Sequence, residues 1–247
     1  MDTPFHHPAG EGSMTHLTGD ERTHFVRKMF SRISKTYDLM NRLMTFGQDL
    51  KWRREAVKLL NSENIRLVLD LGAGTGDMTQ EILQQSPATY VIGVDLTPEM
   101  LKYARNRKGC ENANWVIADV HHLPFPANTF SATISGFLLR NLSNPDPVLV
   151  EQHRVLQDNA IIVCLETSPV RQGLLGPMIR FYIHRVIPML GNLLSKDPEA
   201  YAYLALSTSE FIPAEELAHK MTIIGFQEVR YLRRMFGTIA IHYAQKR

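Results

Sequence analysis

Residues 68–77, which read VLDLGAGTGD, have the composition and spacing of a ligand-binding loop. An apolar run leads into Gly72, Gly74 and Gly76, and a helical pattern begins directly afterwards. Glycine adopts positive φ angles at little cost and lets a ligand approach the main chain closely. A tight strand-to-helix turn without a ligand is the alternative. Three alternating glycines with carboxylates on both sides favour a binding loop.

The charges around this loop indicate which ligand it would accept. A dinucleotide-binding loop has the spacing GxGxxG, and the helix that follows points its N-terminus at a pyrophosphate. Here the spacing is GxGxG, and Asp70 and Asp77 would repel a diphosphate while attracting a cationic amino acid group. S-adenosylmethionine carries such a group. The pattern therefore favours S-adenosylmethionine over a nicotinamide dinucleotide.

Two further acids end the next apolar segments. Asp95 lies about 20 residues beyond the loop, where a carboxylate can bind both ribose hydroxyls. Such charge-assisted bonds contribute about 1.5–3 kcal/mol each. Asp119, followed by Val120, would meet the amino group and the ring of adenine. The alternatives are a helix-capping role for Asp95, although Thr97 already occupies that position, and a solvated loop acid at Asp119.

Alternating strands and helices would bring these acids to one edge of a sheet. The apolar runs are RLVLDL, YVIGVD, NWVIAD, FSATISGF and AIIVCLE, and helical patterns begin at Asp77, Pro98 and Pro147. This alternation is typical of an α/β fold with a doubly wound parallel sheet. A mostly helical stretch over residues 173–206 interrupts it. A helix over residues 213–224 and two strand-like runs, FQEVRYL and GTIAIHYA, follow.

The N-terminal part reads as helical. Apolar residues spaced by three or four positions predict one helix face from Phe25 to Met44, and a second helix is expected over residues 48–60. Polar groups such as Asp38 and Asn41 stand among these apolar residues. We expect this part to cap a ligand pocket, with core packing as a compatible alternative. Residues 1–20 read as a flexible tail. Residues 21–247 read as one domain, with a helical cap over 21–62 and an insertion over 171–207 that covers the active site.

Composition excludes several classes of function. With 44% hydrophobic residues and a formal charge of +2, the chain has no global field for nucleic acid. Cys110 and Cys164 are too far apart for a zinc motif, and a reducing cytoplasmic location fits them. No apolar run has the roughly 20 residues of a membrane span. We expect no metal, because His121 and His122 are adjacent and point in different directions. A basic bias over residues 21–60 would suit anionic lipid, or simply form a solvated helix face.

Several segments in combination resemble the menaquinone/ubiquinone biosynthesis C-methyltransferases, a family of class I S-adenosylmethionine-dependent methyltransferases. They are YDLMN with the later KW, LPFPANTF, LLRNL, IPMLGNLLSKDPEAYAYLALS, RVLQDNAIIVCLETS and GTIAIHY. The resemblance runs from Phe25 to the C-terminus. Thr45 and Asp49 stand where the family usually has Ser and His. Asp158 and Asn159 replace Pro-Gly, although they tolerate the same tight turns.

The resemblance implies a Rossmann-like seven-stranded sheet, mostly parallel, with an antiparallel C-terminal strand, N-terminal helices and a helical insertion. It also implies that Ser135 lines the cofactor, although a strand serine bonded to its own backbone is the alternative. Combined with the loop and the acids, the predicted cofactor-binding residues are Tyr37, Asp70, Gly72, Gly74, Thr75, Gly76, Asp95, Leu96, Asp119, Val120 and Ser135.

The catalytic prediction concerns residues beyond the fourth strand. A quinol ring carbon becomes nucleophilic once a neighbouring phenol loses its proton, and Arg140 with Asn141 would stabilise the phenolate. A surface ion pair is the alternative for Arg140. His184 is a candidate base, as is His242, although such histidines are more often packing residues. Tyr201 and its neighbour Tyr203 would contact the quinol or pack between helices.

The resulting functional hypothesis is methylation of a prenylated quinol, with demethylmenaquinol placed ahead of a benzoquinol. Other hypotheses are methylation of another small molecule, a catalytically silent adenosylmethionine-binding subunit, and a nicotinamide oxidoreductase, which the loop spacing disfavours. The expected partners are the prenylated quinol and, peripherally, the inner face of the membrane. A homodimer is left open, and no nucleic acid is expected.

Overall fold

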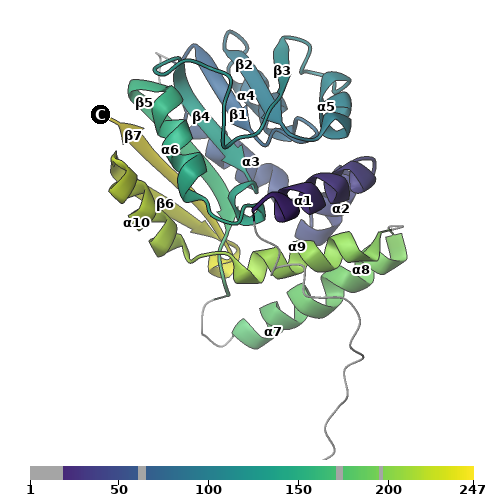
Figure 1. The fold of residues 1–247 in the computed structure, drawn as a ribbon. Helices are drawn as coiled ribbons and strands as arrows, with labels where there is room; N and C mark the ends of the chain where they lie inside the picture. The colour runs from purple at the N-terminus through teal and green to yellow at the C-terminus, as the bar shows by residue number, and fades with distance from the viewer. Residues whose placement is uncertain (1–18, 61–64, 171–174, 195–196) are drawn as a thin grey trace, which may run out of the picture.

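The computed structural model describes residues 19–60, 65–170, 175–194 and 197–247, whose arrangement is shown in Figure 1. These residues form a seven-stranded sheet in the order β3-β2-β1-β4-β5-β7-β6. The strands are β1 Leu67–Leu71, β2 Tyr90–Asp95, β3 Ala113–Ile117, β4 Phe130–Gly136, β5 Leu156–Thr167, β6 Phe226–Arg234 and β7 Ile239–Lys246.

Parallel pairing dominates the sheet. β1 pairs in parallel with β2 and β4, β2 with β3, and β4 with β5, whereas β7 is antiparallel to both β5 and β6. The predicted mostly parallel sheet with an antiparallel C-terminal strand is therefore confirmed. The strand order changes direction between β1 and β4. The carboxyl ends of these strands consequently flank the crevice where open α/β sheets bind ligands.

Helices cover both faces of the sheet. They are α1 Gly19–Ile33, α2 Tyr37–Thr45, α3 Gln48–Lys58, α4 Asp77–Gln85, α5 Pro98–Arg105, α6 Asp146–Val155, α7 Gly176–Phe181, α8 Ile187–Leu194, α9 Pro198–Glu210 and α10 Ala214–Ile224. Successive strand residues point to opposite faces. Leu69 packs in a core cluster with residues of α6 and α10, and Val68 in a second cluster with residues of α3 and α4.

The cap and the insertion share a third core cluster. It joins α1, α2 and α9 and includes Met29, Met40, Tyr201 and Tyr203. Tyr201 and Tyr203 are completely buried, so the packing alternative describes them. The helices α7 and α8 are joined by the π-helical segment Tyr182–Val186, and the three together are called the rod. The rod lies at the bottom of Figure 1, on the side of α9 away from the sheet. Within the described residues, no helix combines the length and the apolar character needed to cross a membrane.

The prediction of one continuous helix from Phe25 to Met44 was wrong, because α1 ends at Ile33 and α2 begins at Tyr37. The break contains two hydroxyl side chains that compete for helix carbonyls: Ser34 Oγ donates to Ser31 O at 2.9 Å and Thr36 Oγ1 to Ile33 O at 3.3 Å. The predicted tail lies almost wholly outside the described residues, and the proposed domain boundaries stay predictions.

Candidate active site

The glycine loop follows β1 directly, and the structural reason for a glycine differs from one loop position to the next. Gly72, Gly74 and Gly76 have φ angles of 63°, 55° and 88°, in the region that disfavours other residues. A Cβ on Gly72 would lie 2.8 Å from Leu138 Cδ1, and one on Gly76 3.1 Å from the Trp115 ring. A Cβ on Gly74 would meet nothing closer than 3.9 Å. Gly74 therefore faces open space, whereas Gly76 serves loop geometry and packing.

A cavity of about 110 Å³ lies at the carboxyl ends of β1, β2 and β3. Those ends meet at one edge because the strands are parallel, so acids far apart in the sequence converge there. The cavity continues against α1 through Val26 and Phe30. The predicted cofactor residues that line it are Tyr37, Gly72, Gly74, Asp95, Leu96, Asp119 and Val120.

Asp95 organises the loop and the start of α5 together. Its Oδ2 accepts the Gly74 N–H at 2.9 Å, and its Oδ1 accepts the Thr97 N–H at 2.8 Å. Burial raises the pKa of Asp95 against the opposing effect of these hydrogen bonds. Thr97 occupies the N-cap position as predicted, but its side chain makes no capping bond. Asp95 therefore has a helix-start role, and it also borders the cavity.

Asp119 is more exposed than Asp95 and has a histidine partner. Its Oδ1 accepts the His121 N–H at 2.9 Å and contacts His121 Nδ1 at 2.7 Å. Burial alone would raise the pKa of Asp119, but these hydrogen bonds and the nearby histidines lower it overall. Asp119 is thus held as a carboxylate at the cavity wall. Among the described residues, no group of three or more His, Cys, Asp or Glu could hold a metal ion.

A smaller cavity, of about 30 Å³, also adjoins the glycine loop, and buried basic and acidic side chains both line it. It is lined by Tyr37, Arg53, Asp70, Thr75 and other loop residues. Asp70 is 1% exposed; its Oδ2 accepts from Thr79 Oγ1 at 2.6 Å, and its Oδ1 has no partner among the residues that the structure describes. Burial raises the pKa of Asp70 to about 7, with the Thr79 bond and Arg53 opposing.

Asp77 does not contribute a free negative charge. Its two oxygens accept from Arg42 Nη2 at 2.9 and 2.8 Å, and Arg107 Nη1 lies 2.9 Å from Oδ1. Burial would raise the pKa of Asp77, but Arg53, Arg107 and Arg42 together lower it. The expectation that Asp77 adds negative potential to the loop is therefore wrong, because its carboxylate is held by arginines.

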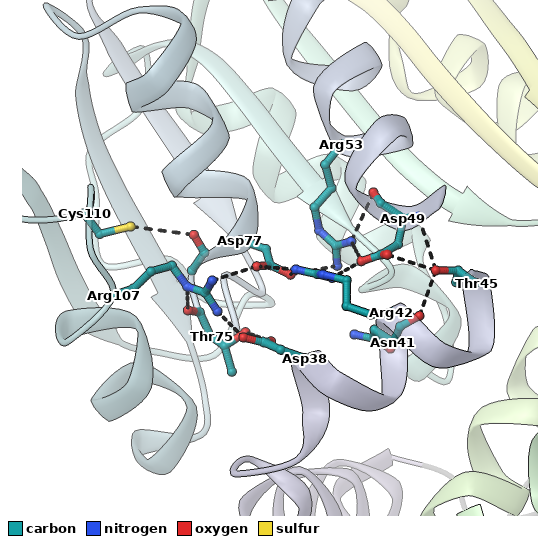
Figure 2. Close-up of polar contacts among 11 residues, drawn as sticks. Asp38, Asn41, Arg42, Thr45, Asp49, Arg53, Thr75, Asp77, Arg107 and Cys110 are labelled. Carbon is teal, nitrogen blue, oxygen red and sulfur yellow. Dashed lines mark hydrogen bonds and ion pairs between the residues drawn. The ribbon is translucent and has the colours of Figure 1, made fainter. Parts of the chain in front are cut away.

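These arginines belong to a network that binds the cap to the loop (Figure 2). Arg42 and Arg53 also pair with Asp49, which is 1% exposed, and Arg107 pairs with Asp38 and donates from Nε to Thr75 O at 2.6 Å. The network thus connects α2, α3, the glycine loop and the segment after α5. Its three arginines were not among the residues predicted for the site.

Two of the positions where this chain departs from the resembled pattern, Thr45 and Asp49, also belong to this network. Thr45 Oγ1 donates to Asp49 Oδ1 at 2.9 Å, and Thr75 Oγ1 donates to Asp38 Oδ1 at 2.5 Å. Thr45 and Asp49 therefore hold the turn between α2 and α3. The sequence signal for this was the alternation of Asp and Arg in the cap, which reads equally well as a solvated surface.

The largest cavity of the candidate site, about 330 Å³, is mostly apolar. Its walls come from α2, α3, α7, α9 and the 3₁₀ turn Met235–Gly237. Phe137 lines both this cavity and the 110 Å³ cavity, so the two adjoin there. Phe137 has a φ of 59° and lies between Arg53 and Arg140, whose Cζ atoms are 5.4 and 5.2 Å from its ring centroid. A non-glycine residue in this conformation is typical of functional sites.

Arg140, which lines the apolar cavity, and Asn141, which lines the 110 Å³ cavity, each have a buried polar atom without a partner among the described residues. Arg140 Nη1 donates to Thr208 Oγ1 at 2.6 Å, while its Nε is buried and unpaired. Asn141 Nδ2 donates to Phe137 O at 2.9 Å, while its Oδ1 is buried and unpaired. Among the described residues, Arg140 thus retains hydrogen-bonding capacity at the apolar cavity and Asn141 at the 110 Å³ cavity, and an unpaired buried polar atom is costly.

Glu166 fixes the turn that carries both residues. This carboxyl is fully buried at the end of β5, and its Oε1 accepts the Leu139 N–H at 2.5 Å. Burial raises the pKa of Glu166 to about 7, and the nearby Arg140 guanidinium opposes the shift. Sequence reasoning missed Glu166, which reads simply as the end of a strand.

Besides Gly76, Tyr201 and Tyr203, which line none of the three cavities, three further predicted residues are not brought to them. His184 is exposed, with Nε2 3.2 Å from Ser209 Oγ, and lines none of the three cavities. His242 is buried in β7 with Nε2 2.9 Å from Ala214 O, and burial lowers its pKa to about 4. Ser135 is fully buried inside β4, paired in register with Cys164, and lines no cavity.

Comparison with known sequences places this geometry in a family context. Residues 15–246 match the ubiE/COQ5 methyltransferase family. The chain is 42% identical over 221 residues to the ubiquinone/menaquinone biosynthesis C-methyltransferase UbiE of Desulfotalea psychrophila, covering 90% of each chain. It is 40% identical over 221 residues to the demethylmenaquinone methyltransferase of Thermus thermophilus, covering 88% of this chain and 100% of that one.

Solved structures agree on the fold. The [4+2]-cyclase SpnF aligns with a TM-score of 0.65 at 16% identity, over 93% of this chain and 97% of that one. A SAM-dependent methyltransferase from Thermotoga maritima aligns with a TM-score of 0.62 at 20% identity, over 89% and 99%. At these low identities, the solved structures show a shared fold and nothing more. The sequence matches, in contrast, are stronger and extend along almost the whole chain. The chain therefore belongs to the ubiE/COQ5 methyltransferase family.

Proposed function

We propose that this protein uses S-adenosylmethionine to methylate a ring carbon of a prenylated quinol, with demethylmenaquinol as the preferred acceptor. The observation that carries the proposal is the junction of two cavities at Phe137: one is lined by acids suited to a nucleoside, and the other is apolar. The relatives named as demethylmenaquinone methyltransferases support the choice of acceptor.

The residues present fit S-adenosylmethionine part by part. Asp95, Asp119 and Val120 line the 110 Å³ cavity, and in this proposal Asp95 binds the ribose hydroxyls while Asp119 and Val120 contact adenine. In the small cavity, the unpaired Asp70 oxygen suits the ammonium group of the methionine end, and the Arg53 guanidinium suits its carboxylate. When bound, this cofactor supplies a methyl group already activated by the sulfonium.

The apolar cavity suits a quinol ring and the beginning of its tail. Its volume of about 330 Å³ is at the lower end of the range for pockets that hold drug-sized molecules. Burial of the ring is favourable by about 25 cal/mol for each Å² removed from water. Flexible methionines such as Met44 and Met178 adapt to an irregular isoprenoid chain. Because such a substrate resides in lipid, this function calls for contact between the protein and a membrane.

Arg140 and Asn141 are the proposed catalytic residues. Arg140 lines the 330 Å³ cavity. Its guanidinium would lower the pKa of a nearby phenol, so that the phenolate activates the ring carbon. Arg140 does not accept the proton itself. Asn141 lines the 110 Å³ cavity and donates from Nδ2 to Phe137 O, and in this proposal its Oδ1 helps to orient the acceptor. His184, which is exposed away from the cavities, is not carried forward as the base.

The test is transfer of a labelled methyl group to lipid. We expect the purified protein, given S-adenosylmethionine labelled at its methyl group and demethylmenaquinol in detergent, to incorporate label into the organic extract. The demethylated benzoquinol precursor serves as the competing substrate. If adenosylhomocysteine raises the melting temperature but neither quinol is labelled, the catalytic proposal is rejected in favour of a silent binder.

A further inference from the structure

We propose that the exposed apolar side chains around the mouth of the 330 Å³ cavity form a docking surface for an anionic lipid bilayer, from which the prenylated substrate enters. This inference rests on the proposed function. The residues of this mouth surface are Phe46, Met178, Phe181, Met189 and Phe236, each more than half exposed. Large exposed apolar side chains gathered in this way indicate an interaction site.

The mouth of the cavity and the apolar surface coincide. Phe46, Met178 and Phe236 line the cavity and are at the same time exposed, so the cavity opens between them. Two contacts join the end of α2 to the segment after α7 at this mouth: the Phe46 and Tyr182 rings are 5.8 Å apart, and Tyr182 Oη donates to Met44 O at 3.0 Å.

The rod from α7 to α8 extends this surface. Met178 and Phe181 are three residues apart on α7 and therefore lie on one helix face. Met189 follows on α8, and this rod lies on the outside of α9 in Figure 1. Neither Phe181 nor Met189 lines the cavity, so their exposure has no explanation in substrate contact.

Charge complementarity favours an anionic bilayer as the occupant. Residues 176–194 contain Arg180, His184 and Arg185 but no Asp or Glu, and these three side chains are exposed. A membrane surface with anionic lipid attracts the arginines Arg180 and Arg185 by about 1 kcal/mol each. The rod is therefore apolar and cationic together, which is the composition that binds the interface of a bilayer.

The basic residues of the cap are less suitable for this role, because many of them are engaged within the protein. Arg22 donates to the backbone oxygens of Arg140 and Asn141, and Arg32 pairs with Asp197. Arg42 and Arg53 belong to the network around Asp77 and Asp49. We therefore place the membrane contact on the mouth surface instead of the basic cap.

The size of the cavity gives a second reason for a lipid partner. A bicyclic quinol ring takes up much of the 330 Å³, so a long prenyl tail must leave through the mouth. The side chains at the mouth then meet either the tail in water or the tail in lipid, and only lipid keeps the tail and these side chains out of water.

Vesicle binding by matched variants tests this surface. The full chain is floated with vesicles of phosphatidylcholine alone or with phosphatidylglycerol added, at two salt concentrations. We expect binding to the anionic vesicles, and binding about tenfold weaker for Phe181→Ser, because a phenylalanine side chain no longer enters the interface. Arg180→Gln should weaken binding about fivefold and reduce its salt dependence. Ile223→Ser removes an apolar side chain of similar exposure, 71%, on α10, and should bind like the unmodified protein.

Activity then separates docking from chemistry. With a short-tailed, water-soluble quinol, Phe181→Ser and the unmodified protein should turn over equally; with a prenylated quinol in vesicles, the variant should show a higher KM. Met189→Ser provides an independent variant, and circular dichroism checks that each is folded. Absence of vesicle binding by the unmodified protein, equal binding by Phe181→Ser, or a dimer that Phe181→Ser dissociates would overturn the proposal. If the soluble quinol is not methylated, the proposed function fails, while the flotation result still decides the surface.

Discussion

Asp70 is a residue at which burial and ligand binding act in opposite directions. Its carboxyl is almost completely buried and one oxygen lacks a partner, so burial raises its pKa to about 7. An ammonium group placed against that oxygen would favour the ionised form. The neutral carboxyl is therefore the form of the empty site below neutral pH, and the carboxylate is the form that would bind the cofactor.

This opposition predicts a pH-dependent affinity. Below pH 7 the carboxyl must lose a proton before it binds the ammonium group, so the Kd for adenosylhomocysteine should be about tenfold higher at pH 6 than at pH 8. Isothermal titration calorimetry at several pH values would measure this. Asp70→Asn should bind weakly and with little dependence on pH over the same interval. An unmodified protein whose Kd is constant from pH 6 to pH 8 would contradict the assignment.

Glu166 predicts a pH-dependent stability. Its pKa in the folded protein is about 7, raised above the ordinary value of 4.5, so the folded state holds a proton that the unfolded state releases. The stability from this group is fully present below pH 4.5 and is lost as the pH rises through 7. Urea unfolding of Glu166→Gln should therefore show a smaller loss between pH 5 and pH 8, by on the order of 3 kcal/mol. An equal loss in both proteins would rule this out.

Arg140 and Asp95 should separate turnover from cofactor binding. Arg140→Leu removes the charge that favours the phenolate, and we expect kcat to fall about 100-fold with the affinity for adenosylhomocysteine unchanged. Asp95→Ala removes the acceptor of the Gly74 and Thr97 N–H groups and the ribose partner, and should abolish cofactor binding. Methyl transfer and calorimetry on both variants provide the comparison. Normal turnover by Arg140→Leu would remove it from the mechanism.

At the level of elements, the cap helices are fastened to the glycine loop by buried ion pairs. Breaking a buried pair costs about 3–5 kcal/mol, because it leaves the partner charge unpaired. Asp49→Ala leaves Arg42 and Arg53 without this partner, so we expect the free energy of unfolding to fall by about 3 kcal/mol. Glu228→Ala, which breaks an exposed pair with Arg247, is the control and should cost less than about 1 kcal/mol. Similar losses in both variants would show that the network is not a buried one.

The elements that the sequence predicted well are those whose pattern is local. The strands β1, β2 and β3, near whose carboxyl ends Asp70, Asp95 and Asp119 lie, follow from short apolar runs, although β3 ends at Ile117, before Asp119; the convergence of the three acids follows from parallel pairing. The break between α1 and α2 was missed, because the apolar spacing continues across it while Ser34 and Thr36 interrupt the hydrogen bonds. Apolar periodicity alone does not reveal such a break.

The polar network could not be predicted, because its partners are distant in the chain. Arg42 and Asp77 are 35 residues apart, and Arg107 and Asp38 are 69 apart. These pairings decide which carboxylate at the loop can still bind a ligand. Asp77 is ion-paired with arginines, whereas Asp70 Oδ1 has no partner in the part of the chain that the structure describes. The contacts of both residues with the cofactor stay predictions.

At the level of the whole molecule, cap, insertion and sheet form one assembly around the two large cavities. α1 and α2 pack with α9 of the insertion, while Arg22 of α1 donates to the turn that carries Arg140 and Asn141. A displacement of the cap would therefore disturb the 110 Å³ cavity and the 330 Å³ cavity together. The helical insertion is a wall of the site because it packs against the cap.

The shared wall at Phe137 has a kinetic consequence. The nucleoside cavity is bounded by α1 and the strand ends, whereas the apolar cavity opens between Phe46, Met178 and Phe236. Under the proposed binding, donor and acceptor occupy separate cavities, so neither has to leave before the other binds. Steady-state lines at several fixed acceptor concentrations should intersect, as for a ternary complex, and a methylated quinol could depart while the spent nucleoside is still in place.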